Sequence, residues 1–319
     1  MKRALKGTIA IVALLSAVPV LAADYPYMRP GYAESWKNPD DDLRFEFGTR
    51  YWLSWGEQDA SFTAAGLGDV GVTTRDQTHI VELHGKIEDL STQTYLTGKA
   101  GIGLSTSGTY AITPARSGAI GRNSAIGYAA TDFGWLPFGK LDEGFAAGGF
   151  VGYQYWKDAP DIGSGQVGAT FAGNTPTSFT AAKDDLDIHA LRLGVKAQAD
   201  FDKFDIQGEI AAIPYAHVSG TLGGSSPDGF NLGGTEFQER APTTLSGRGY
   251  GVMVESLVGF HPTENLTLRV GGRAWYVEGV LDAQFSANAG GTDQATLNLP
   301  SNFARIFRYG ALFEATGRF

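Results

Sequence analysis

The sequence predicts an all-β fold: a closed, antiparallel transmembrane β-barrel of about ten strands, with short periplasmic turns and long extracellular loops. Three observations carry this prediction. Segments in which apolar and polar residues alternate recur along the chain, as expected for strands that face two different surroundings. Short and long connections between these segments follow one another in strict alternation. The N-terminus of the 319-residue chain is typical of an exported protein.

The N-terminal segment is typical of a secretory signal peptide. Lys2, Arg3 and Lys6 precede an apolar run over residues 9–21, and the small residue Ala22 follows. The run is shorter than the roughly 20 residues that a membrane-spanning helix needs. We therefore predict a signal peptide at 1–22, an N-terminal arm at 23–41 and an outer-membrane barrel at 42–319.

Composition narrows the class further. The formal net charge is −9, and removal of the three basic residues of the leader makes it more negative, so we expect no nucleic-acid partner. The chain has no cysteine, which excludes disulfides and thiolate metal sites. It has 44 glycines and no long apolar helix candidate after the leader, and a chain of this kind crosses a membrane only as a closed barrel.

The alternation is clearest at the start of the predicted barrel. Over residues 42–55, Phe45 and Tyr51 share one face with other apolar residues, whereas Glu46 and Arg50 lie on the opposite face. The same pattern predicts ten strands, at 42–55, 75–87, 92–103, 124–135, 145–156, 187–199, 204–218, 248–260, 266–279 and 309–319.

The connections indicate a barrel rather than the alternative, a soluble β-sandwich. Short turns join every second pair of strands, and the remaining connections are long and rich in Gly, Ser, Thr and Pro. A sandwich gives no reason for all long loops to share one rim, whereas outer-membrane barrels have short periplasmic turns and longer extracellular loops. The predicted long loops are 57–72, 104–122, 158–185, 220–246 and 280–301.

Aromatic residues on the outward face form two predicted interfacial belts. One lies near the short turns: Phe45, Trp135, Phe145, Phe204, Phe260 and Phe319. The other lies near the long loops: Tyr51, Trp55, Tyr155, Tyr250, Tyr276 and Phe307. Phe319 resembles the terminal aromatic signature of bacterial outer-membrane barrels, and the resemblance implies recognition by the barrel assembly machinery as an assembly signal.

Charged residues of both signs fall on the inward face and predict a lumen charge network. Its members are Arg44, Glu46, Arg50, Glu82, His84, Lys86, Arg192, Lys196, Glu209, Arg269 and Arg273. Glu82 and His84 also fit an acid/base or metal pair, but two lone ligands fall short of a metal site. The lumen of a ten-strand barrel is narrow and largely filled by side chains, which favours ion pairs over catalysis. We predict no metal and no cofactor.

Cationic residues gather on the outward face near the long loops. They are Arg75, His79, His189, Arg248 and Arg305. This distribution suggests contact with the phosphates of lipopolysaccharide, although snorkelling at a lipid interface would place cations in the same positions.

His217 is the weak candidate for a catalytic residue. The alternation places it on the inward face near the long loops, but the sequence around it supplies no carboxylate partner. Pro214, which lacks a backbone N–H, predicts a bulge or break in this strand.

The segments FVGYQYW (150–156), FDKFDIQGEIAAIPYAHVSGT (201–221) and GFHPTENLTLRVGGRAWYVEG (259–279) resemble the omptin barrels of Gram-negative outer membranes. The resemblance implies a ten-strand barrel, and omptins are endopeptidases in which an acidic pair of the second loop and an Asp-x-His pair of the fourth loop activate a water. Here the second loop, LSTSGTYAITPARSGAIGR, has no Asp or Glu. Leu222 and Gly224 stand at the Asp and His positions.

These observations predict a protein of the Gram-negative outer membrane that is non-catalytic, either a surface or structural barrel or a narrow pore, with recognition by its extracellular loops. The expected partners are the outer membrane, its lipopolysaccharide and the assembly machinery. The alternative is an omptin-like endopeptidase that draws on other residues: Asp228, Glu236, Glu239 and His217. A small-solute porin is disfavoured by the narrow lumen.

Overall fold

The computed structural model describes residues 42–64, 68–113, 116–141, 143–161, 185–222, 230–232, 235–239, 243–289 and 293–319. The predicted signal peptide and N-terminal arm lie outside these residues. Among the residues described, no helix is long and apolar enough to span a membrane.

Ten long strands and three short ones form one sheet. The long strands are β1 (Leu43–Ala64), β2 (Gly68–Asp89), β3 (Thr94–Thr113), β5 (Gly121–Lys140), β6 (Phe145–Asp161), β7 (Asp185–Phe201), β8 (Phe204–Leu222), β11 (Thr243–Thr263), β12 (Leu266–Ala289) and β13 (Asp293–Arg318). The short strands are β4 (Arg116–Ala119), β9 (Phe230–Leu232) and β10 (Thr235–Glu239).

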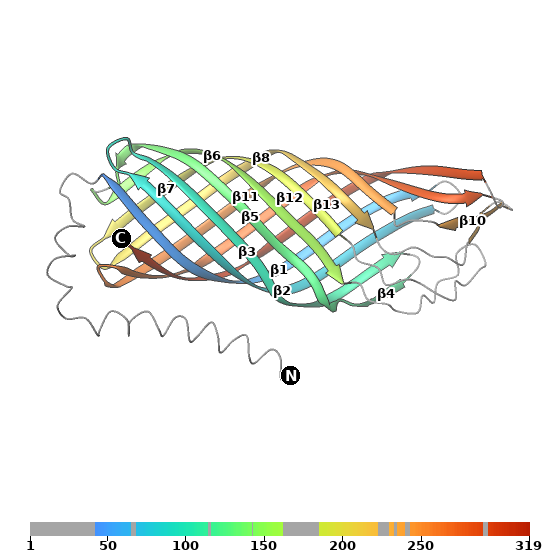
Figure 1. Cartoon of the computed structure of the whole chain (residues 1–319), viewed down its shortest axis with the longest axis horizontal. Helices are drawn as coiled ribbons and strands as arrows, with labels where there is room; N and C mark the ends of the chain where they lie inside the picture. The colour runs from blue at the N-terminus through green and yellow to red at the C-terminus, as the bar shows by residue number, and fades with distance from the viewer. Residues whose placement is uncertain are drawn as a thin grey trace. The chain divides into compact units, whose positions relative to one another are not determined.

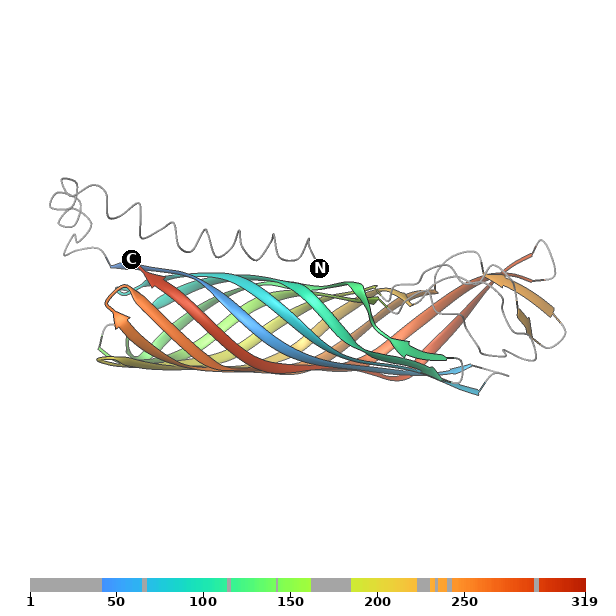
Figure 2. The same ribbon diagram turned by 90° about the horizontal axis from the view of Figure 1, so that it is seen from below.

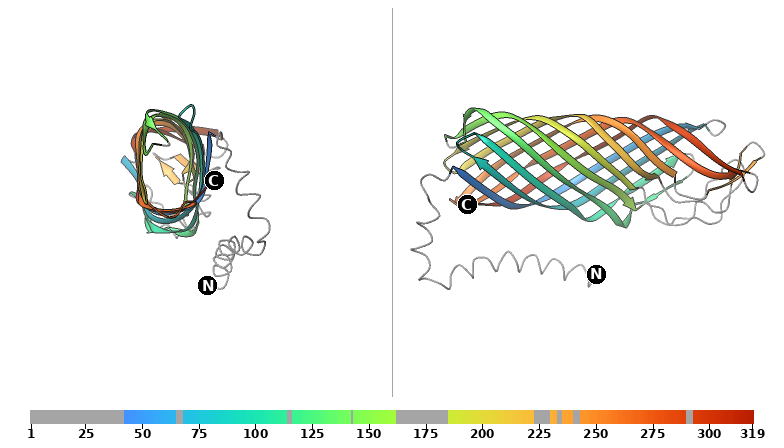
Figure 3. Two further views of the ribbon diagram at one scale, coloured as in Figure 1. Left: turned by 90° about the vertical axis from the view of Figure 1, so that its left-hand side faces the viewer. Right: turned by 45° about the horizontal axis from the view of Figure 1, so that its top comes forward.

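Each long strand pairs antiparallel with the preceding one, and the sheet closes on itself (Figure 1). The closing ladder joins β1 to β13, from Glu46 opposite Arg318 to Phe62 opposite Ser301. Viewed from its end, the barrel has an oval cross-section (Figure 3). The predicted closed ten-strand antiparallel barrel is therefore confirmed.

The two ends of the barrel differ, and we call them the turn end and the loop end. At the turn end, consecutive strands are joined by short turns. In the turn between β2 and β3, the Asp89 carboxylate accepts hydrogen bonds from the backbone N–H of Ser91 at 2.9 Å and from that of Thr92 at 3.1 Å. At the loop end the strands run on, and β12 and β13 extend furthest (Figure 2).

The strands are longer than the sequence predicted. They contain 17 to 26 residues, whereas about 9–11 suffice for a tilted strand to cross a membrane. The expectation of a loop over 57–72 is wrong, because β1 continues to Ala64 and β2 begins at Gly68. The barrel wall therefore extends well beyond the length needed to cross a bilayer.

The polarity of the two faces inverts along the barrel near the level of Trp52. In the turn half, between Trp52 and the turn end, large apolar side chains such as Phe47 and Phe313 are exposed on the outside, while charged side chains fill the inside. In the loop half, Phe62 and Ile188 are buried inside. The outside there carries polar and charged residues. The turn half is built for lipid, and the loop half is built like a water-soluble β-barrel with an apolar core.

The predicted bulge at Pro214 is confirmed. The pairing of β8 shifts between Ile213 and Ala216 against β11, and between Ala212 and Tyr215 against β7. Such an extra residue reverses which side of the sheet the following side chains face.

Candidate functional site

The lumen of the turn half contains a network of ion pairs around Arg50. This guanidinium donates hydrogen bonds to Glu82 at 3.0 Å and Glu255 at 3.2 Å, and it also bonds Glu314. Glu82 and Glu314 lie on the two strands next to β1, whereas Glu255 lies on β11. Arg50 therefore links side chains that are far apart in the sequence and nearly inaccessible to solvent.

Arg273 on β12 forms a second centre in the same network. It donates to Glu255 Oε2 at 2.6 Å, to Glu82 Oε2 at 2.9 Å and to the Tyr128 hydroxyl at 2.5 Å. Glu82 and Glu255 are thus shared by two arginines. These carboxylates are held by several cations at once, which suits a fixed scaffold better than a free acid or base.

The structure places the remaining predicted lumen residues on the inner side as well. Their contacts are Arg44 with Glu88, Lys86 with Glu46 and Glu88, Arg192 with Asp132 and Glu209, Arg269 with Asp205, Glu46 and Glu314, His84 with Thr316, and Lys196 with the ring of Tyr95. Glu82 and His84, the suggested acid/base pair, each bond to other partners. Lys196 is the member without an ion pair among the described residues.

A layer of aromatic side chains lies above this network, toward the loop end. Trp156 stacks between Tyr128 and Trp275, with ring centroids 5.2 Å and 5.3 Å away, and Trp52 meets it edge-on at 6.0 Å. The three tryptophans are each 1% exposed. A cavity in this layer, beside Arg273, measures about 10 Å³, which is room for one water at most. These packed rings lie across the lumen between the charged network and the loop end.

A compact ion cluster covers the other side of the aromatic layer. Arg308 donates to both carboxylate oxygens of Asp76, at 2.9 and 2.8 Å, and to Asp158 at 3.4 Å. Its guanidinium carbon lies 5.2 Å from the centre of the Trp156 ring. Gly56 leaves the space for this cluster, since a Cβ there would fall 2.5 Å from Arg308 Nη2 and Asp76 Oδ2.

The sequence reasoning missed this cluster and the aromatic layer. Asp158 fell in a predicted loop. Asp76 was not assigned to the network, although it lies an even number of residues from Glu82 on the same strand and therefore faces the same side of the sheet. Trp52 and Trp156 likewise share the parity of inward residues in their strands. Parity alone could have placed these side chains in the lumen.

The predicted outward cations lie on the outside of the loop half, where carboxylates accompany two of them. Arg305 donates to Asp59 Oδ2 at 2.9 and 2.7 Å, and Arg75 lies 3.4 Å from Glu57. Arg248 is exposed and has no hydrogen bond or ion pair with a described residue. The predicted histidines pair with tyrosines, His79 with Tyr51 and His189 with Tyr153.

The expectation that His217 faces inward is wrong. His217 is exposed and lies opposite His189 on β7 and Arg248 on β11, both of which face outward. The bulge at Pro214 is the cause, because it reverses the parity of β8 beyond that point. Among the other residues of the enzyme alternative, Asp228 lies outside the described residues, as do the side chains of Glu236 and Glu239.

One group of side chains near the turn end has the composition of a metal site. Potential ligand atoms of Asp200, Asp205 and His261 lie within 4.8 Å of one another. Asp205 also accepts hydrogen bonds from Arg269, and His261 Nε2 lies 3.0 Å from Asp205 while its Nδ1 lies 2.9 Å from the Thr267 hydroxyl. Asp205 and Thr267 already contact the two ring nitrogens of His261. Arg269 lies beside Asp205, where its positive charge would repel a metal cation.

A closed antiparallel barrel whose turn half is apolar outside and charged inside is a transmembrane barrel of the outer-membrane class. The chain is therefore an outer-membrane β-barrel, the class that spans the outer membrane of Gram-negative bacteria. Accordingly, the turn end is the periplasmic end and the loop end is the extracellular end.

Comparison with known proteins agrees with this class at the level of fold. The sequence matches no family model and no curated protein sequence. The structure is similar to that of the outer-membrane protease OmpT from Escherichia coli, with a TM-score of 0.58 and 11% identity over 88% of this chain and 97% of that one. The match to the translocator domain of the autotransporter NalP from Neisseria meningitidis has a TM-score of 0.35, with 10% identity over 95% of this chain and 97% of that one. At 11% identity, the likeness to OmpT shows the fold alone.

Proposed function

We propose that this protein is a non-catalytic structural barrel that holds an extended extracellular rim at the cell surface and conducts no solutes. The observation that carries the proposal is the filled lumen. The aromatic layer around Trp156 lies between the clusters of Arg273 and Arg308, and the cavity described within it measures about 10 Å³. A narrow pore needs a continuous water path, and the close packing of these rings supports the absence of one.

The positions of the histidines support the absence of omptin-type catalysis. The chain has five histidines, and all five lie among the described residues. His79, His189 and His217 face outward, whereas His84 and His261 lie in the periplasmic half. No imidazole faces the interior of the extracellular half, where a surface peptidase would need a general base within reach of its substrate.

The likeness in fold to OmpT makes an endopeptidase the alternative that must be tested. We expect the refolded barrel, supplied with lipopolysaccharide, to leave fluorogenic peptides with paired basic residues uncleaved. A His217→Ala variant should give the same baseline as the native chain, because His217 faces away from the lumen. Cleavage by the native barrel that disappears in His217→Ala would overturn the non-catalytic assignment.

We further propose that the outward cations of the extracellular half contact the phosphates of lipopolysaccharide. Arg248 is the best placed, since it is exposed and has no carboxylate partner among the described residues. Arg305 and Arg75 have to share their charge with Asp59 and Glu57. The outward face of the extracellular half therefore carries charges of both signs. Its attraction for phosphates should be weaker than its arginines alone would give.

Neutralising the three arginines tests this contact. The triple variant Arg75→Gln, Arg248→Gln and Arg305→Gln is expected to bind lipopolysaccharide about tenfold more weakly, with Arg248→Gln alone giving the largest single effect. Arg318→Gln at the periplasmic rim is the control. Binding can be measured by calorimetry in neutral detergent. Equal affinity of the triple variant and the native barrel would leave only the snorkelling interpretation.

A further inference from the structure

Lys196 on β7 differs from every other charged side chain described in the lumen. Each of the other lumen arginines and lysines has a carboxylate within 4 Å. Lys196 is only 8% exposed, yet among the described residues no carboxylate lies within that distance of its ammonium. Its ammonium lies over an aromatic face, 4.8 Å from the centre of the Tyr95 ring.

The pairing register explains why Lys196 lacks a carboxylate. Its neighbour on β6 is Gly148, which has no side chain. Its neighbour on β8 is Glu209, but the Glu209 carboxylate accepts hydrogen bonds from Arg192 at 2.9 Å and from Lys99 at 3.3 Å. Both of these cations bond Oε1 of Glu209, so the carboxylate beside Lys196 in the register already shares its charge with two other cations.

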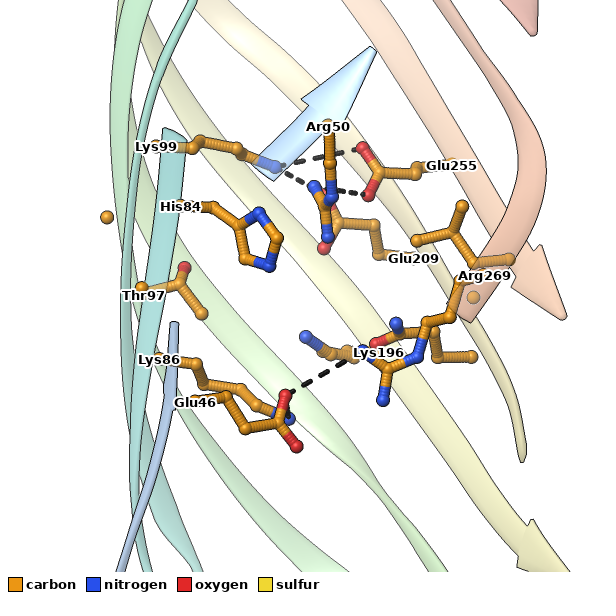
Figure 4. A pocket seen from close by; sticks show the side chains of 15 residues that line it. Glu46, Arg50, His84, Lys86, Thr97, Lys99, Lys196, Glu209, Glu255 and Arg269 are labelled. Atoms are coloured by element: carbon orange, nitrogen blue, oxygen red, sulfur yellow. Dashed lines mark hydrogen bonds and ion pairs between the residues drawn. The ribbon is translucent and has the colours of Figure 1, made fainter. Parts of the chain in front are cut away.

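Lys196 lines a cavity in the periplasmic half of the lumen. Figure 4 shows Lys99, His84 and Lys86 on one side of this space and Glu209 and Arg269 on the other. The cavity measures about 40 Å³, and a single water needs about 10–15 Å³ by the same measure. It has room for a few waters, or for one small oxyanion in their place.

Three carboxylates also line the cavity, Glu46, Glu209 and Glu255, but each is ion-paired, so the ammonium of Lys196 is the charge there without an ion-pair partner among the described residues. A buried ammonium without a counter-ion is costly, and the cost falls when a charged acceptor reaches it. The neighbouring cations have their own carboxylates, Lys86 with Glu46 and Lys99 with Glu209. These pairs therefore do not require a further anion. Their N–H groups nevertheless line the same space.

We propose that this cavity is a binding site for a small oxyanion, such as inorganic phosphate, with Lys196 as its principal ligand. The aromatic layer closes the cavity toward the extracellular half, so the anion enters from the periplasmic end. Lys99 and the amide of Gln207 lie on the cavity wall and can donate further hydrogen bonds. The site is independent of what the extracellular rim recognises.

Phosphate titration of the refolded full chain in neutral detergent tests the proposal. At constant ionic strength set with chloride, phosphate is expected to raise the urea midpoint of the native barrel, because a ligand that binds only the folded state stabilises it. Lys196→Met should weaken phosphate binding by at least about tenfold, whereas Lys196→Arg, which keeps the charge, should retain it. Calorimetry with inorganic phosphate measures the affinity directly.

The matched control is Lys157→Met, which removes an outward lysine that lies 2.6 Å from Asp185. In phosphate-free buffer Lys196→Met should unfold at an equal or higher urea concentration than the native barrel, since it removes an unpaired buried charge. An equal phosphate effect in the native barrel, Lys196→Met and Lys157→Met would overturn the site. So would a lower midpoint for Lys196→Met without phosphate, which would indicate an internal partner for Lys196.

Discussion

Replacing Arg308 by methionine is expected to lower the free energy of unfolding by about 3–5 kcal/mol, because the change leaves buried carboxylates without a cation. Asp76 and Asp158 are 8% and 3% exposed, and Arg308 is their ion-pair partner. Among the described residues no other cation lies within 4 Å of either carboxylate. Urea unfolding of the refolded barrel, followed by tryptophan fluorescence, measures the loss.

A double variant separates unpaired charge from lost packing. Arg308→Met combined with Asp76→Asn should recover part of the stability, since one of the two stranded charges is then gone. Arg75→Met, which breaks an exposed pair with Glu57, should change the unfolding free energy by less than about 1 kcal/mol. Equal losses for Arg308→Met and Arg75→Met would show that the buried cluster has no special role.

Replacing Trp156 by alanine is the second change from which we expect a large effect. The indole is 1% exposed and contacts Trp52, Tyr128 and Trp275. Loss of a buried tryptophan costs about 3–5 kcal/mol, which includes the cavity that it leaves. The same urea titration measures it, with Trp55→Ala as the control.

The control is matched in size but not in surroundings. Trp55 is 37% exposed on the outside of the same strand as Trp52, where it stacks on Tyr309. Its removal should therefore cost less than that of Trp156. A larger loss for Trp55→Ala would mean that the aromatic layer inside the barrel is loosely packed and does not close the lumen.

Much of the barrel could be predicted from the alternation of residues in its periplasmic half. There the lipid side is apolar and the lumen is charged, so Phe45 and Glu46 differ sharply in polarity and their faces are easy to assign. The choice of a barrel over a β-sandwich followed from the alternation of short and long connections. These signals arise because the outer face contacts lipid and has to be apolar, whereas the inner face can be charged.

The extracellular half could not be predicted in the same way, because its polarity is inverted. Residues such as Thr73 and Arg75 face water on the outside, while Val72 is buried inside, so the segment lacks an apolar outer face and resembles a polar loop. The predicted loops at 57–72 and 280–301 are largely strand for this reason. The wall continues because its backbone pairing and its apolar interior do not depend on lipid.

The error at His217 has a more local cause. The inward assignment of His217 assumes regular alternation of side chains along β8 past Pro214, although a bulge is predicted at that residue. One extra residue moves the side chains beyond it to the opposite face, so the predicted bulge and the predicted inward His217 were incompatible. The unpaired Lys196 could not be foreseen, because it results from which cations reach Glu209 across the lumen.

Single-channel recording tests the central claim that the lumen is closed. The refolded native barrel, inserted in a planar bilayer, is expected to give no conductance steps above the baseline, because the layer of Trp52, Tyr128, Trp156 and Trp275 interrupts the water path. A Trp156→Ala and Trp275→Ala double variant, if it folds, should give measurable steps under the same voltage. Steady conductance by the native barrel, equal to that of the double variant, would contradict the account.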